Sequence, residues 1–216
     1  MPIDFVRAHT TLAPVPFVPE ILLSQAEEPI ALWEATEALG VPGFGKTQPP
    51  PFWAFAWAGG QALARHLLDD PDLVSGRSVL DLATGSGLVA IAAAKAGAAP
   101  VIANDIDPYS LAAAQANAKA NRVRVDALEA DLLESDDKYG VVLAGDVFYS
   151  REMAARVLPF LRRAAGRGSL VLVGDPGRAY APEGLIERAV YEVPVNEELE
   201  GVPVRRTTVW QVTAGR

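Results

Sequence analysis

The sequence predicts an α/β fold: a doubly wound, mostly parallel sheet of seven strands with an antiparallel C-terminal strand and helices on both faces. From residue 77 onward, short apolar runs alternate with segments of helical periodicity, as in parallel strands joined by crossover helices. The last two extended runs, 191–195 and 204–212, flank a polar stretch, which indicates an antiparallel closing pair. Five parallel strands and this terminal hairpin together make seven strands.

The parallel strands are expected to be short and apolar. Their expected ranges are 78–83, 100–105, 124–131, 139–148 and 169–175. The run at 139–148 is almost continuously apolar, which favours a strand that is buried on both faces.

The connecting segments have helical periodicity and recognisable start signals. Asp107 suits the N-cap of a helix and Pro108 suits its first position, where the missing N–H costs nothing. The expected helices are 87–96, 108–119, 152–165 and 183–190.

The first 76 residues are expected to form a helical and irregular cap, packed on a core that comprises residues 77–216. A chain of 216 residues has room for one sizeable core, so a second full domain is not expected. A helix is expected at 30–39, and the apolar spacing from Ala62 onward predicts another that runs toward the sheet.

The composition excludes several classes of function. There is no cysteine, and the two histidines, His9 and His66, lie far apart, so no metal site is expected. The formal net charge is −8 and no basic stripe is visible, which argues against binding to nucleic acid. Neither a membrane span nor a secretory signal is apparent, so we expect a soluble, cytoplasmic protein, and we expect it to be a monomer.

A glycine turn after the first core strand indicates a nucleoside-binding site. Gly85-Ser86-Gly87-Leu88-Val89-Ala90 matches G-x-G-x-x-A, and Asp105 follows twenty residues after Gly85, where an acid can hold a ribose. These residues fit a nicotinamide cofactor and other nucleoside cofactors equally well.

Asp81 discriminates between these cofactors. It lies four residues before the first glycine, where a carboxylate would repel a pyrophosphate at the helix N-terminus. It suits a cofactor with a cationic end, such as S-adenosylmethionine with its ammonium and sulfonium. Asp131, after the third strand, is placed to accept a hydrogen bond from an adenine amino group.

The segments DLATGSG, IANDIDP and ADLL resemble the class I S-adenosylmethionine-dependent methyltransferases, over roughly residues 77–175. Many members have glycine where this chain has Ala83, and we expect only a slight change in backbone approach there. The resemblance implies a Rossmann-like sheet and S-adenosylhomocysteine as the product. The expected cofactor-binding residues are Trp57, Asp81, Gly85, Ser86, Gly87, Asn104, Asp105, Asp131 and Gly145.

A narrower resemblance involves the end of the fourth strand. Asp146-Val147-Phe148-Tyr149 looks like the D-x-x-Y motif of the seven-β-strand protein-lysine methyltransferases, and Trp57 matches their tryptophan over the cofactor. Ala58 departs from the common Trp-Pro pair. HTTLAPVPFVPEI, DVFYSREMAARVLPFL and VGDPGRAYAP look most like the electron transfer flavoprotein β-subunit lysine methyltransferases and their bacterial homologues. The resemblance implies that subunit as the protein partner.

The expected catalytic residues are Asp146 and Tyr149. Lysine has a pKa near 10.4, so the site must bind the neutral amine and aim its lone pair at the methyl group. Asp146, or the carbonyl groups of its turn, can orient the amine and accept its proton, while Tyr149, Phe148 and Trp57 can form the channel walls. Alternatively, these three aromatic residues belong to the core.

The loop after the fifth strand is the expected substrate-facing loop. Asp175 and Arg178 are candidates there for binding the substrate together with Phe148, although Asp175 can equally begin a turn. The alternative functions are methylation of a ribosomal protein or a small amine, a nicotinamide-dependent oxidoreductase, and a non-catalytic module that binds S-adenosylmethionine.

Overall fold

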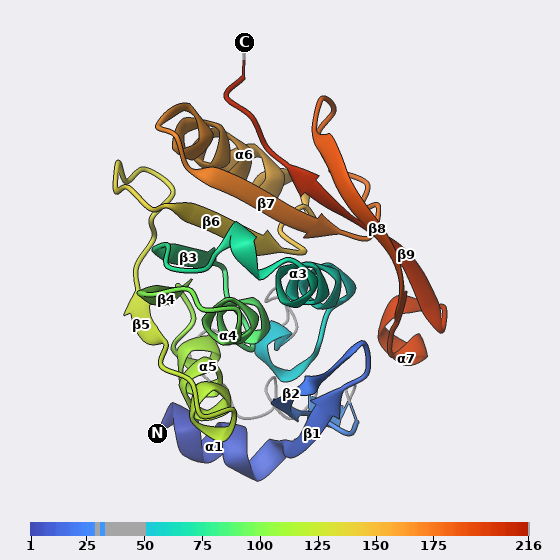
Figure 1. Cartoon of the computed structure of the whole chain (residues 1–216). Helices are drawn as coiled ribbons and strands as arrows, with labels where there is room; N and C mark the ends of the chain where they lie inside the picture. Colours follow the sequence, from blue (N-terminus) through green and yellow to red (C-terminus); the bar gives the residue numbers. More distant parts are fainter. Residues whose placement is uncertain (29–30, 33–50, 216) are drawn as a thin grey trace.

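The computed structural model describes residues 1–28, 31–32 and 51–215. Its centre is a seven-stranded sheet with the strand order β5-β4-β3-β6-β7-β9-β8 (Figure 1). The strands are β3 (Val79–Leu82), β4 (Val101–Asp105), β5 (Asp126–Glu129), β6 (Val141–Gly145), β7 (Leu170–Asp175), β8 (Ile186–Pro194) and β9 (Val204–Gln211).

The first five strands of this order pair in parallel, as the sequence predicts. Parallel strands present their carboxyl ends at one edge of the sheet, so the residues that follow β3, β4, β6 and β7 lie close together. All five parallel strands are shorter than expected, most clearly β5 and β6, which are shorter at both ends. Asp146 ends β6 because its backbone is in the left-handed region, with φ at 55°.

The expected helix at 183–190 is wrong, because β8 covers Ile186–Pro194. Val190, Tyr191 and Val193 are β-branched or aromatic, which favours an extended backbone. β9 pairs antiparallel with both β7 and β8, so the last strand is inserted between its two neighbours. The expected antiparallel closing pair is therefore confirmed, with a longer first strand. A short helix, α7 (Glu197–Glu200), lies between the two strands of the pair.

Helices cover both faces of the sheet, as predicted (Figure 1). One face carries α3 (Ala58–Asp69), α4 (Leu88–Lys95) and α5 (Pro108–Ala120), whose side chains share a hydrophobic core with inward-facing residues of the strands. The other face carries α6 (Arg151–Gly166), which packs there in a second core with Phe160 and Leu161. α4 is apolar on nearly all sides because α3 and α5 flank it on the sheet.

The start of the chain is more regular than expected. α1 (Pro2–His9) packs on α5, and β1 (Thr11–Val15) and β2 (Val18–Gln25) form an antiparallel hairpin that was not predicted. Two single-turn helices, η1 (Phe52–Ala54) and η2 (Pro71–Leu73), flank α3. The expected helix at 30–39 lies almost entirely outside the described residues. No helix of the described residues is long and apolar enough to cross a membrane.

Candidate functional site

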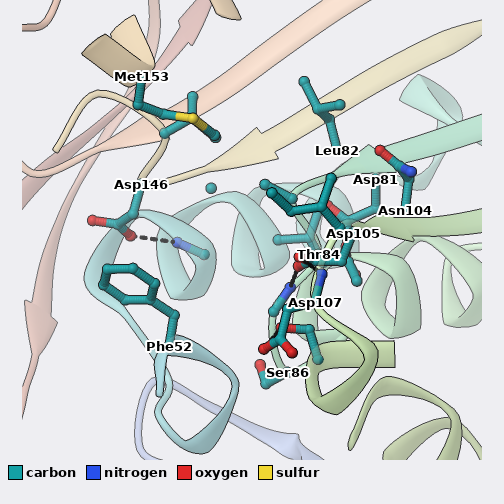
Figure 2. A pocket seen from close by; sticks show the side chains of 18 of the residues that line it. Phe52, Asp81, Leu82, Thr84, Ser86, Asn104, Asp105, Asp107, Asp146 and Met153 are labelled. Atoms are coloured by element: carbon teal, nitrogen blue, oxygen red, sulfur yellow. Dashed lines mark hydrogen bonds between the residues drawn. The ribbon is translucent and has the colours of Figure 1, made fainter. Parts of the chain in front are cut away.

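A cavity of about 690 Å³ lies at the carboxyl ends of the parallel strands. In Figure 2, Asp146 and Phe52 lie on one side of it, and Asp81, Asn104, Asp105 and Asp107 lie on the other. Its size is within the range of pockets that bind nucleotide-sized or drug-sized molecules. The predicted site residues that line it are Trp57, Asp81, Gly85, Ser86, Asn104, Asp105, Asp131, Gly145, Asp146, Tyr149 and Arg178.

The glycine turn between β3 and α4 has an unusual backbone. Ala83, Gly85 and Gly87 all have positive φ, at 54°, 52° and 81°. Glycine adopts this region freely and alanine at some cost, so Ala83 carries backbone strain that glycine would avoid. Gly87 does not line the cavity. A Cβ on it would lie 2.8 Å from Ala114 Cα, so this glycine allows α4 and α5 to pack closely.

Asp81 is a buried carboxylate on the cavity wall, with a side chain that is 1% exposed. Its Oδ2 accepts hydrogen bonds from the Thr84 hydroxyl at 2.5 Å and from the Ala90 N–H at 3.0 Å. Burial raises the pKa of Asp81 to about 7, and these hydrogen bonds oppose the shift. The site therefore favours a cation that would compensate the buried charge. Thr84 was not among the residues predicted for this site.

Asp105 ends β4 and holds the glycine turn. Its carboxylate accepts hydrogen bonds from the N–H groups of Gly85 and Asp107, both at 3.0 Å. Burial raises its pKa. Ile106 follows it with 68% exposure and lines the cavity, so a carboxylate and an apolar surface lie side by side.

Two further residues predicted to bind the cofactor, Asn104 and Asp131, both have protein partners. The Asn104 side chain donates to the carbonyl groups of Leu128 and Ala130, both at 2.9 Å, and so joins β4 to the end of β5. Asp131 is exposed, and its carboxylate pairs with Arg156 at 2.6 Å. That hydrogen bond and one from the Leu133 N–H lower the pKa of Asp131.

An aromatic wall closes one side of the cavity. It consists of Phe52, Phe55, Trp57 and Tyr149. Trp57 Nε1 donates to the Phe52 carbonyl at 2.9 Å, and the Phe52 ring lies 5.1 Å from Tyr149 and 5.6 Å from Trp57. Phe52 and Phe55 were not predicted as site residues, although the segment FWAFAW is rich in aromatic residues.

Asp146 is surrounded by groups of the protein itself. Its Oδ2 accepts from the N–H groups of Gly59 at 2.5 Å and Gly60 at 3.2 Å, at the N-terminus of α3. Its Oδ1 accepts from Arg178 at 2.9 Å. Burial raises the pKa of Asp146 to about 6, and Arg178 opposes that rise.

Phe148 and Asp175 differ from the expectation that they contact the substrate. Phe148 is fully buried and packs in the core beneath α6, which is the alternative interpretation given above for this aromatic residue. Asp175 is 1% exposed and accepts from the N–H groups of Gly177 and Arg178, at 2.7 and 2.8 Å. It therefore begins the turn after β7. The same turn places Arg178 at the cavity wall.

The cavity thus has two chemically different parts. One part has the glycine turn, Asp81, Asp105 and Ile106, which suit a nucleoside with a cationic substituent. The other has aromatic side chains beside Asp146 and Arg178, which suit a long apolar stem that carries a nitrogen at its end.

Comparisons with known proteins match parts of the chain to methyltransferases. Residues 62–147 match the family model described as ribosomal protein L11 methyltransferase (PrmA). Two solved structures share the fold. A magnesium protoporphyrin IX methyltransferase of Synechocystis with bound S-adenosylmethionine has a TM-score of 0.53 at 19% identity, over 71% of this chain and 78% of that one. A putative RNA methyltransferase of Pyrococcus horikoshii has a TM-score of 0.57 at 16% identity, over 84% and 97%.

Sequence relatives are more similar. The electron transfer flavoprotein beta subunit lysine methyltransferase of Xenopus laevis is 36% identical over 217 residues, which cover 97% of this chain and 86% of that protein. The protein of the same name from Homo sapiens is 39% identical over 168 residues, 74% of this chain and 64% of that protein. The chain belongs to the family of electron transfer flavoprotein beta subunit lysine methyltransferases.

Proposed function

We propose that this chain transfers methyl groups from S-adenosylmethionine to lysine in the electron transfer flavoprotein β subunit. The observation that carries the proposal is a single cavity that joins the strand-end acids and the glycine turn to the aromatic wall beside Asp146. Relatives named for this reaction align with up to 97% of the chain, which supports the choice of substrate.

The acids of the cavity fit the cofactor. When bound, S-adenosylmethionine supplies a methyl group that its sulfonium makes transferable. Asp81 would hold the ammonium group, because a buried carboxylate with a raised pKa gains most from a cation beside it. Asp105 would accept from the ribose hydroxyls, and Ile106 offers apolar surface to the base. Asp131 stays a candidate for the adenine amino group, with one oxygen already paired to Arg156.

The aromatic part of the cavity would bind the lysine side chain. Tyr149 is 42% exposed and lies against Phe52, so both rings can contact the stem of a lysine that enters there. Both oxygens of Asp146 already accept hydrogen bonds from the protein. We therefore assign Asp146 to orientation of this wall, and the carbonyl groups of its turn and the Tyr149 hydroxyl to contact with the amine.

A methylation assay tests the proposal. Purified protein is incubated with S-adenosylmethionine and electron transfer flavoprotein, and the β subunit is examined by intact-mass and peptide mass spectrometry. The expected result is lysine methylation that S-adenosylhomocysteine inhibits and that Asp81→Asn strongly reduces. Cofactor binding without methylation of the flavoprotein would contradict the proposed substrate. Absence of cofactor binding by calorimetry would contradict the proposed methyl transfer.

We further propose that the protein acts as a cytoplasmic monomer on a protein partner and not on nucleic acid. A chain with 27 acidic and 19 basic residues repels a polyanion, which supports this choice of partner. Light scattering coupled to gel filtration, with and without the flavoprotein, measures the oligomeric state and any complex.

A further inference from the structure

A chain of mostly buried ion pairs joins the terminal hairpin to the cavity. Arg205 of β9 approaches Glu200 of α7, with Nε 3.3 Å from Oε2. Arg178 donates to both carboxylate oxygens of Glu200, at 2.9 and 3.2 Å, and to Asp146 Oδ1 at 2.9 Å. The Glu200 side chain is 4% exposed. Glu200 is thus the link that lies between two arginines.

The Arg178 guanidinium has little freedom. It lines the cavity, its Nη2 donates to both Asp146 and Glu200, and its Nη1 donates to Glu200. Its backbone lies in the turn that Asp175 holds. The position of this positive charge at the cavity wall is therefore set by Asp175, Glu200 and Asp146 together.

Asp146 links this series of ion pairs to α3. Its second oxygen accepts from Gly59 and Gly60, where a carboxylate is favoured by the helix dipole. Its orientation therefore fixes the contact between the end of β6, the start of α3 and the aromatic wall that precedes this helix. Buried ion pairs contribute little net stability, so the main effect of these ion pairs is to hold the Arg178 and Asp146 side chains in place.

We propose that Glu200 is a positioning residue for methyl transfer, which holds Arg178 at the cavity wall and so keeps the Asp146 carboxylate on the N-terminus of α3. This proposal rests on the proposed methyl transfer. Without Glu200, Arg178 turns toward solvent and Asp146 loses its cation. The lysine amine then meets a wall whose charge and orientation have changed.

The titration of Asp146 distinguishes this role from a passive one. The charged groups that face its carboxylate are Arg178, Asp175 and Glu200. If Arg178 stays in place when Glu200 becomes neutral, loss of a negative charge lowers the pKa of Asp146. If Arg178 leaves, loss of the positive charge raises that pKa. The two cases differ in sign.

The experiment follows the carboxyl ¹³C shift of Asp146 against pH in the full-length protein without cofactor, with the signal assigned through Asp146→Asn. We expect Glu200→Gln to move the midpoint upward by about one unit or more. Turnover on electron transfer flavoprotein should fall about 10- to 100-fold while the Kd of S-adenosylhomocysteine is unchanged. Arg178→Met gives the reference for complete loss of the cation.

Two further variants complete the test. Glu200→Asp keeps the charge but shortens the side chain, so we expect the Asp146 midpoint to shift upward in this variant too. This milder variant replaces Glu200→Gln if the latter does not fold. Glu198→Gln changes an exposed residue of the same short helix and should leave the midpoint unchanged. A downward or absent shift in the folded Glu200 variants would overturn the proposal. Because the titration needs no turnover, it stays informative if the wild type does not methylate the flavoprotein.

Discussion

Asp81 is the residue at which burial and charge oppose each other most directly. Its side chain is 1% exposed, and two hydrogen bonds are insufficient to offset desolvation, so its pKa rises to about 7. Asp81 therefore titrates near neutral pH in the absence of a ligand, and a bound cation would lower its pKa.

This shift predicts a pH dependence of cofactor binding. S-adenosylhomocysteine retains the amino group, so its affinity should rise from about pH 6 to about pH 7.5 as Asp81 ionises. Above about pH 8 the amino group of the ligand loses its proton and affinity should fall again. Calorimetry across this range measures both limbs. Asp81→Asn should weaken binding and abolish the rising limb, and a rising limb that survives in this variant would contradict the assignment.

The same shift predicts that Asp81→Asn stabilises the free protein. The folded pKa of about 7 exceeds the unfolded value of 3.8, so the folded state binds more protons between these values and stability falls as pH rises through this window. At pH 8 this loss of stability is complete in the wild type, whereas Asp81→Asn avoids it because its side chain does not ionise. We expect the unfolding free energy of the variant to exceed that of the wild type by about 1–3 kcal/mol in urea denaturation. The exposed Asp72→Asn is the control, and equal gains in both variants would refute the cause.

At the scale of elements, the start of α3 lies very close to β7 of the sheet. A Cβ on Gly59 would overlap the Gly174 carbonyl oxygen of β7 and lie 2.5 Å from Asp146 Oδ2. A Cβ on Gly60 would meet Leu88 at 3.7 Å, an ordinary contact. Two adjacent glycines of one helix are therefore under different constraints.

These contacts predict opposite outcomes for two alanine variants. Gly59→Ala should lower the unfolding free energy by about 1–3 kcal/mol and reduce turnover, because α3 must move away from β7 and Asp146. Gly60→Ala should be neutral, or stabilising by up to about 1 kcal/mol through helix propensity. Urea denaturation measures both. Equal losses in the two variants would show that the close approach to Gly174 is not the constraint.

At the scale of the whole molecule, two asparagines attach the N-terminal hairpin to the core: Asn117 within α5 and Asn121 at its C-cap. Asn117 accepts from the Ser24 N–H at 2.8 Å and donates to the Ser86 carbonyl at 2.9 Å. Asn121 exchanges two hydrogen bonds with the backbone of Leu22. Asn117 thus connects β2 directly to the glycine turn of the cavity.

Asn117→Ala should therefore affect both stability and ligand binding. It leaves a backbone N–H and a carbonyl without their partner, which costs about 2–4 kcal/mol in urea denaturation. The glycine turn also loses support, so S-adenosylhomocysteine should bind more weakly. Gln115→Ala on the exposed face of the same helix should change stability by no more than about 0.5 kcal/mol. Full cofactor affinity in Asn117→Ala would show that the turn does not depend on the hairpin.

The parallel core was predictable because its signals are local. Apolar runs, Asp107 and Pro108 at a helix start, and the spacing from Asp81 to Gly85 and Asp105 can each be recognised in a short window. Strand lengths were less predictable, since β6 ends where Asp146 adopts a positive φ, and β8 forms where β9 offers a partner.

The sequence by itself determined the parallel sheet, the glycine turn and the family, and most of the site residues predicted from it line the cavity. Only the tertiary structure decided how those residues are used. Phe148 lies in the core, Asp175 begins a turn, and Asp146 binds Arg178 and α3. The side-chain partners of Asp146 come from two distant segments, the start of α3 and the turn after β7, and Glu200 reaches Arg178 from α7, between β8 and β9. Spacing along the chain encodes contacts within one strand–turn–helix unit, whereas the side chain that neutralises a buried charge is chosen by packing in three dimensions.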